Sequence, residues 1–240
     1  MAPPKAILFD VGGVVVLSPF QAILDYELEN RIPIGYINHA IQQGPPSTGA
    51  WQLIERGATP LNDAWFAAFA AQLSRPDVWH AYWIRWSARG GGHADSGTTS
   101  LLGEHVPPVP RIDAKKLFWR MMRYSRRPDG AMYPALKALR RKGEGRWVVG
   151  ALSNTVDFPT GIVDDEGVLF DKSVLYDGRP EWEGDSANIA DWFDVYLSSA
   201  HIGVRKPDPE AYRLAGETKA AVRALEREVG VSLMEERSKL

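Results

Sequence analysis

Three residues with chemically active side chains each follow a short apolar segment, although they lie far apart in the sequence. They are Asp10, Ser153 and Lys206. A carboxylate can act as a nucleophile, a hydroxyl can donate a hydrogen bond to an anion, and an ammonium group can neutralise negative charge. In an open parallel sheet, reactive groups gather at the carboxyl ends of the strands. We therefore expect these three side chains to converge on one pocket.

The apolar segments themselves are predicted to be strands of a parallel sheet, because continuous apolar runs are typical of strands buried on both faces. The predicted strands are Ala6–Asp10, Arg146–Leu152 and Trp192–Leu197. Gly12 and Gly13 supply a flexible turn after the first strand. Lys206 is expected to begin a helix after the third strand, since Pro207 and Pro209 suit a first helical turn.

Helical periodicity after the first strand indicates a helical segment inserted into an α/β core. We expect a Rossmann-like parallel sheet core formed by residues 1–18 and 130–240, with an inserted helical cap formed by residues 19–129. Residues 89–111 are rich in Gly, Ser, Thr and Pro, which predicts a flexible insertion within the cap. We assign no function to that insertion.

The composition excludes several classes of function. The 240 residues carry a formal net charge of -2, so the chain lacks the excess of positive charge that is typical of proteins that bind nucleic acid or an anionic membrane surface. The absence of cysteine excludes disulfides, thiolate catalysis and thiolate metal sites. The apolar run near the N-terminus is interrupted by Asp10, so it resembles neither a signal peptide nor a membrane span. We expect a soluble protein whose partner is a small-molecule substrate.

Each candidate residue also has a purely structural interpretation. Asp10 and the glycines could form only a turn, in which Asp and Gly are favoured. Ser153 and Asn154 could cap a following helix. Lys206 could be a solvated lysine, although a cation at the N-terminal end of a helix is unfavourable without an anion nearby. The residue types and their spacing leave both interpretations open.

Taken together, three motifs in order resemble the haloacid dehalogenase superfamily of hydrolases. They are Phe9–Val14, Leu152–Thr155 and Arg205–Tyr212. The resemblance covers roughly residues 5–213, with the predicted cap in the place of the family's helical cap. The residues of the motifs are most similar to those of the subgroup that contains the N-terminal phosphatase domain of soluble epoxide hydrolase.

The resemblance implies a role for each residue of the site. Asp10 would attack phosphorus and form an aspartyl-phosphate that water then hydrolyses, while Lys206 would offset the negative charge. The phosphoryl group would be bound by four residues, namely Gly12, Gly13, Ser153 and Asn154. The resemblance also implies a magnesium ion that bridges Asp10, the Gly12 carbonyl and the phosphate.

The chain departs from the family pattern in two places. Family phosphatases commonly carry a second aspartate two residues after the nucleophile, where this chain has Gly12. The paired-aspartate fourth motif that holds magnesium in the family is also missing, and compared with the family pattern a block of roughly two or three dozen residues is absent between Leu214 and Gly216. We therefore expect a sheet that is incomplete on its C-terminal side, and we hypothesise a splice or gene-model variant.

Three functions follow from this pattern. The leading one is a phosphatase of a small phosphorylated metabolite, impaired by the missing fourth motif. The second is a 2-haloacid dehalogenase, in which Asp10 attacks carbon and no magnesium is needed. The third is a catalytically inactive binding protein of the same superfamily.

The sequence finishes with Ser238, Lys239 and Leu240, the tripeptide that acts as a peroxisomal address. We expect the peroxisomal import receptor to bind this tripeptide. The alternative is that these residues only end a helix, in which case we expect a cytoplasmic protein.

Overall fold

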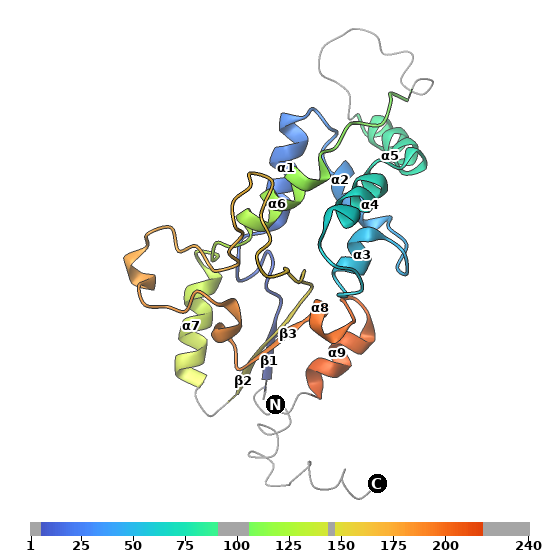
Figure 1. Cartoon of the computed structure of the whole chain (residues 1–240). Coiled ribbons are helices and arrows are strands. Elements are labelled where there is room, and N and C mark those ends of the chain that lie inside the picture. Colours follow the sequence, from blue (N-terminus) through green and yellow to red (C-terminus); the bar gives the residue numbers. More distant parts are fainter. Residues whose placement is uncertain (1–5, 91–105, 144–146, 218–240) are drawn as a thin grey trace, which may run out of the picture.

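The sheet lies at the centre of the protein, with a layer of helices at the carboxyl ends of its strands (Figure 1). The computed structural model describes residues 6–90, 106–143 and 147–217. Within these residues the strands are β1 (Ala6–Phe9), β2 (Val148–Ser153) and β3 (Val195–Ser198). They are parallel, in the order β1-β2-β3, and every residue of the central strand β2 is buried. The predicted α/β fold is confirmed.

The sheet is open at β1, as expected from the missing fourth motif. In the described part of the chain β1 pairs only with β2, from Ala6 opposite Val148 to Phe9 opposite Ala151. Leu8 on β1 is 46% exposed, and no strand of the described residues pairs with the free edge. The sheet therefore ends at the strand that leads to Asp10.

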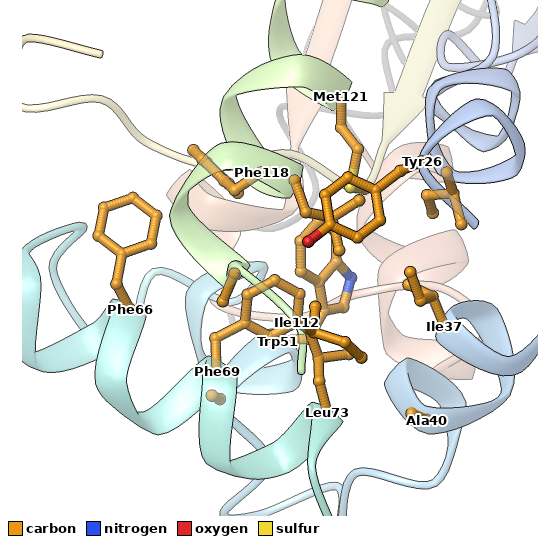
Figure 2. Packing of buried hydrophobic residues seen from close by; sticks show 14 of the residues in the cluster. Tyr26, Ile37, Ala40, Trp51, Phe66, Phe69, Leu73, Ile112, Phe118 and Met121 are labelled. Atoms are coloured by element: carbon orange, nitrogen blue, oxygen red, sulfur yellow. The ribbon is translucent and has the colours of Figure 1, made fainter. Parts of the chain in front are cut away.

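Six helices form the layer at the carboxyl ends of the strands, which we call the helical layer. They are α1 (Pro19–Glu29), α2 (Tyr36–Gln42), α3 (Ala50–Ile54), α4 (Asp63–Leu73), α5 (Pro76–Ala88) and α6 (Ala114–Tyr124). The side chains of Ser18, Asn62 and Asp113 cap α1, α4 and α6 by accepting backbone N–H groups of the first turn. Figure 2 shows how aromatic and aliphatic side chains of these helices pack into one buried cluster.

The sheet and the remaining helices, which we call the sheet layer, have a second buried cluster of their own. The α-helices here are α7 (Met132–Gly143), α8 (Ser199–Ile202) and α9 (Pro209–Gly216). Two 3-10 helices, η1 (Pro180–Trp182) and η2 (Ile189–Trp192), lie beside α7. The buried residues of the first cluster all come from the predicted cap, and those of the second all come from the predicted core. The domain boundaries themselves stay a prediction.

Two expected boundaries are wrong. The third strand begins at Val195, because Trp192 ends the 3-10 helix η2, whose first turn Asn188 caps. Lys206 does not begin a helix either, because Asp208 accepts the Glu210 N–H and so caps α9 two residues later. Lys206 lies in the preceding turn, and its peptide bond to Pro207 is cis.

Other predictions fall partly or wholly outside the described residues. Residues 106–111 contain no helix or strand, and the rest of the expected insertion after Gly90 is not described. The tripeptide Ser238–Leu240 also lies outside, so the peroxisomal address stays a prediction. Among the described residues, no helix combines the length and the apolar character that crossing a membrane requires.

Phe69, which is labelled in Figure 2, tests the packing of the helical layer. Its ring is fully buried and stacks on Trp65 at 5.0 Å between ring centroids. We expect Phe69→Ala to lower the free energy of unfolding by about 3–5 kcal/mol, through lost burial and an unfilled cavity. Urea unfolding of the whole chain measures this change. The matched control is Phe20→Ala, since Phe20 is 62% exposed. Equal losses for the two variants would contradict the packing described.

Candidate active site

Asp10 and Lys206 form an ion pair at the carboxyl ends of the strands. The Lys206 Nζ lies 2.6 Å from Asp10 Oδ1, and the Val11 N–H donates to the same oxygen at 2.7 Å. The lysine side chain is 17% exposed and the aspartate side chain 49% exposed. Among the described residues no group donates a hydrogen bond to Asp10 Oδ2, and the contact with Lys206 is made through Oδ1. This oxygen is therefore free to attack a substrate.

The turn after β1 leaves space beside Asp10. The Val11 carbonyl accepts the N–H groups of Val14, Val15 and Val16, which folds the chain back at once. Gly13 has a φ of +78°, in the left-handed region that favours glycine. A Cβ at Gly12 would meet nothing within 4 Å, and the Gly12 N–H donates to no acceptor among the described residues. An anion next to Asp10 would find both room and a donor at Gly12.

Asn154 fixes the main chain of Lys206. The Lys206 N–H donates to Asn154 Oδ1 at 2.8 Å, and Asn154 Nδ2 donates to the Lys206 carbonyl at 3.1 Å. Each polar atom of the amide thus makes one hydrogen bond to Lys206, while the phosphate contact expected from the sequence would be made by the Asn154 main-chain N–H. The side chain of Asn154 acts instead as a positioning group for the lysine.

Ser153 ends β2 and lies beside a residue that the sequence analysis missed. Tyr196 on β3 pairs in register with Ala151, on the same face of the sheet as Ser153. Burial raises the pKa of the Tyr196 phenol, a hydrogen bond with Ser153 opposes that rise, and the nearby Asp10 carboxylate adds to it. The phenol is held neutral beside Asp10. Its place on the alternating face of β3 is the signal that could have found it.

A second pair of charges lies next to the first. Arg205 Nε is 2.6 Å from Glu55 Oε2, and Glu55, directly after α3, is only 10% exposed at its side chain. Burial raises the pKa of the Glu55 carboxyl, and the Arg205 and Lys206 cations pull it back only in part. No local pattern in the sequence connects Glu55 with residues near the C-terminus, so the analysis of motifs missed it.

The residues around Asp10 do not form a magnesium site on their own. Magnesium prefers several oxygen ligands in octahedral geometry. Among the described residues, no group of three His, Asp or Glu side chains is placed to hold a metal ion. Asp10 Oδ1 is already engaged by Lys206, and Gly12 brings no second carboxylate. The donor set therefore does not fit the ion that the motif resemblance implies.

Comparison with known proteins finds similarity only to solved structures. No protein-family model matches the chain, and no curated protein matches it. A wild-type HAD family enzyme from Bacteroides thetaiotaomicron, in complex with magnesium and inorganic phosphate, is 16% identical, with 96% of this chain and 92% of that chain covered and a TM-score of 0.40. An L-2-haloacid dehalogenase from Xanthobacter autotrophicus, with chloropropionic acid covalently bound, is 16% identical, with 91% and 66% covered and a TM-score of 0.40. Because these TM-scores are low, the site is interpreted from its own geometry.

Asn154→Ala tests the two hydrogen bonds by which the Asn154 amide fixes the main chain of Lys206, which we call the Asn154 clamp. We expect the free energy of unfolding to fall by about 1–2 kcal/mol, because the Lys206 N–H and carbonyl lose their partners. Urea unfolding measures the loss. Asn38→Ala on α2 is the control, since the Asn38 side chain makes no hydrogen bond among the described residues and alanine is the better helix former. A loss no larger than that of the control would contradict the clamp.

Gly12→Asp tests whether the lack of a second carboxylate explains why the residues around Asp10 do not form a magnesium site. We expect the wild type to show no saturable Mg²⁺ binding in the micromolar range by titration calorimetry, because it offers a single carboxylate. The aspartate side chain has room, and we expect it to tighten Mg²⁺ binding. Gly12→Asn is the matched control without charge. Micromolar binding by the wild type, or equal binding by the two variants, would contradict this explanation.

Proposed function

We propose that this chain is a hydrolase of the haloacid dehalogenase superfamily that cleaves a small phosphate ester through a covalent intermediate on Asp10. The observation that carries the proposal is the ion pair between Lys206 Nζ and Asp10 Oδ1, while Oδ2 accepts no hydrogen bond from the described residues. Lys206 orients the Asp10 carboxylate through this contact. The order of the three motifs supports the superfamily, and the geometry at their ends supports the reaction type.

In the first step Asp10 Oδ2 attacks phosphorus, and the bond from phosphorus to the leaving oxygen breaks. Negative charge on the transferred group needs donors that are already in place. Lys206, the Gly12 N–H and the Ser153 hydroxyl are the candidates, because Lys206 pairs with Asp10, Gly12 lies in the turn after β1 and Ser153 ends β2. In the second step water attacks phosphorus, which releases inorganic phosphate and regenerates the Asp10 carboxylate.

The leaving group limits the substrate. An alkoxide needs a proton as it leaves, and Gly12 stands where family phosphatases commonly place the acid that supplies it. Leaving groups that are stable as anions, such as a phenolate or a carboxylate, do not need that proton. We therefore propose that aryl or acyl phosphates react faster than alkyl phosphates.

A second candidate function is hydrolysis of a 2-haloacid, which one observation favours. Displacement of halide from carbon by a carboxylate needs neither a metal ion nor a proton donor, and the described residues offer no metal cluster. Asp10 would then form a carbon ester, and the halide would leave. The same donors that suit a phosphate would bind the carboxylate of the haloacid.

Turnover of para-nitrophenyl phosphate and chloride release from 2-chloropropionate test both functions. We expect phosphate release by the wild type and none by Asp10→Asn, because the amide is a poor nucleophile. Asp157→Asn is the control, since Asp157 is 65% exposed at its side chain and pairs only distantly with His201. Activity that survives in Asp10→Asn would contradict the proposal, and silence of the wild type with both substrates would favour the binding protein.

Single turnover in ¹⁸O-labelled water separates the two chemistries at the level of atoms. Water attacks phosphorus in an aspartyl-phosphate, so we expect the label in phosphate and not in Asp10. Water attacks the carbonyl carbon of a carbon ester, so a dehalogenase would place the label in the Asp10 carboxylate. Mass spectrometry of the peptide that contains Asp10 reads the result, and label found there would overturn the phosphatase in favour of the dehalogenase.

A further inference from the structure

We propose that Glu55 is a positioning residue, which closes the helical layer onto the sheet layer through Arg205 and thereby holds Lys206 against Asp10. The catalytic part of this inference rests on the proposed function, whereas the closure does not. Glu55 touches no reacting atom and acts through its neighbours. Nothing in the motif resemblance points to this residue, which lies in the predicted cap.

The first support is a set of contacts from the turn after α3 to the sheet layer. The Glu55 carboxylate pairs with Arg205 Nε at 2.6 Å, and the Glu55 carbonyl accepts the Ser199 hydroxyl at 2.5 Å. Ser199 is buried at the start of α8, and its Oγ also accepts the Thr155 N–H at 2.9 Å. Figure 1 shows α3 next to α8. Both the side chain and the main chain of Glu55 therefore connect the two layers.

The second support is the arrangement of two neighbouring ion pairs, Glu55 with Arg205 and Asp10 with Lys206. Arg205 and Lys206 are consecutive, yet their side chains go to carboxylates on different layers, Glu55 and Asp10. The main chain of Lys206 is fixed by Asn154 at the same time. Because Arg205 is held from the helical layer, a shift of that layer would pull on the residue directly before the lysine. Separation of the layers should therefore disturb the contact with Asp10.

The third support is the close approach of the backbones at Gly57, two residues after Glu55. Gly57 has a φ of +65°, and a Cβ there would lie 2.2 Å from the Ala200 carbonyl oxygen. Such a distance is far below contact, so any larger residue would push the turn away from α8. The turn after α3 therefore packs tightly against the sheet layer. Glu55, in the same turn, adds an ion pair to this contact.

The test of closure uses distances and needs no turnover. Because the chain has no cysteine, Ala67→Cys on α4 and Ala135→Cys on α7 provide two unique sites for spin labels, both exposed. We expect a single narrow distance distribution in the parent protein and a broader or shifted one in Glu55→Gln. Glu29→Gln is the matched control, because the pair of Glu29 with Arg120 lies wholly within the helical layer. Gly57→Ala should separate the layers without any change of charge.

The test of positioning uses kinetics. We expect Glu55→Gln to lower kcat roughly 10- to 100-fold with a smaller change in KM, since a small misplacement of a reacting group has that effect. Glu55→Asp should recover part of the loss because it keeps the charge. Glu29→Gln should match the parent protein in both constants.

Each outcome decides one part of the proposal. An unchanged distance distribution in Glu55→Gln and Gly57→Ala would overturn the closure. A changed distribution with unchanged kcat would overturn the positioning role. If the parent protein hydrolyses neither substrate, the proposed function fails while the distance measurement still confirms or overturns the closure by Glu55. Should Glu55→Gln fail to fold, Gly57→Ala and Glu55→Asp answer the same questions.

Discussion

The ion pair between Asp10 and Lys206 is the contact on which the site depends. It joins the end of the first strand to a turn near the far end of the described chain, at 2.6 Å. A lysine that is only 17% exposed is stabilised by a nearby anion, and its positive charge offsets the negative charge that Asp10 and an anionic substrate would share. The parallel register of β1, β2 and β3 is what brings the two together. Asn154 and Glu55 then hold the lysine from two sides.

The open edge of the sheet shapes this pair as well. In the described residues β1 has a neighbour on one side only, and Asp10, directly after it, is 49% exposed at its side chain. A further strand on the free side would cover β1. Residues at the carboxyl end of that strand would lie next to Asp10, because functional groups in parallel sheets gather at the carboxyl ends of the strands. The same gap thus explains the exposed Leu8, the exposed nucleophile and the lack of a second carboxylate for a metal ion.

The parts of the fold that could be predicted are those set by local patterns. The continuous apolar runs predicted the strands, and the rule that functional groups collect at strand ends placed Asp10, Ser153 and Lys206 on one edge. The start of α9 was wrong because two prolines suggested it, whereas the capping carboxylate of Asp208 decides it. Tyr196 and Glu55 were missed because their importance comes from contacts made only after folding. The alternating position of Tyr196 on β3 could have marked it, whereas no sequence pattern connects Glu55 with Arg205.

A double-mutant cycle on Asp10→Asn and Lys206→Met tests the central contact most directly. The free energies of unfolding of the wild type, the two single variants and the double variant give the coupling between the side chains. The account predicts a favourable coupling of about 0.5–1 kcal/mol, since the aspartate is half exposed and water screens part of the attraction. Effects that add without any coupling would show that the two charges do not meet in the folded chain.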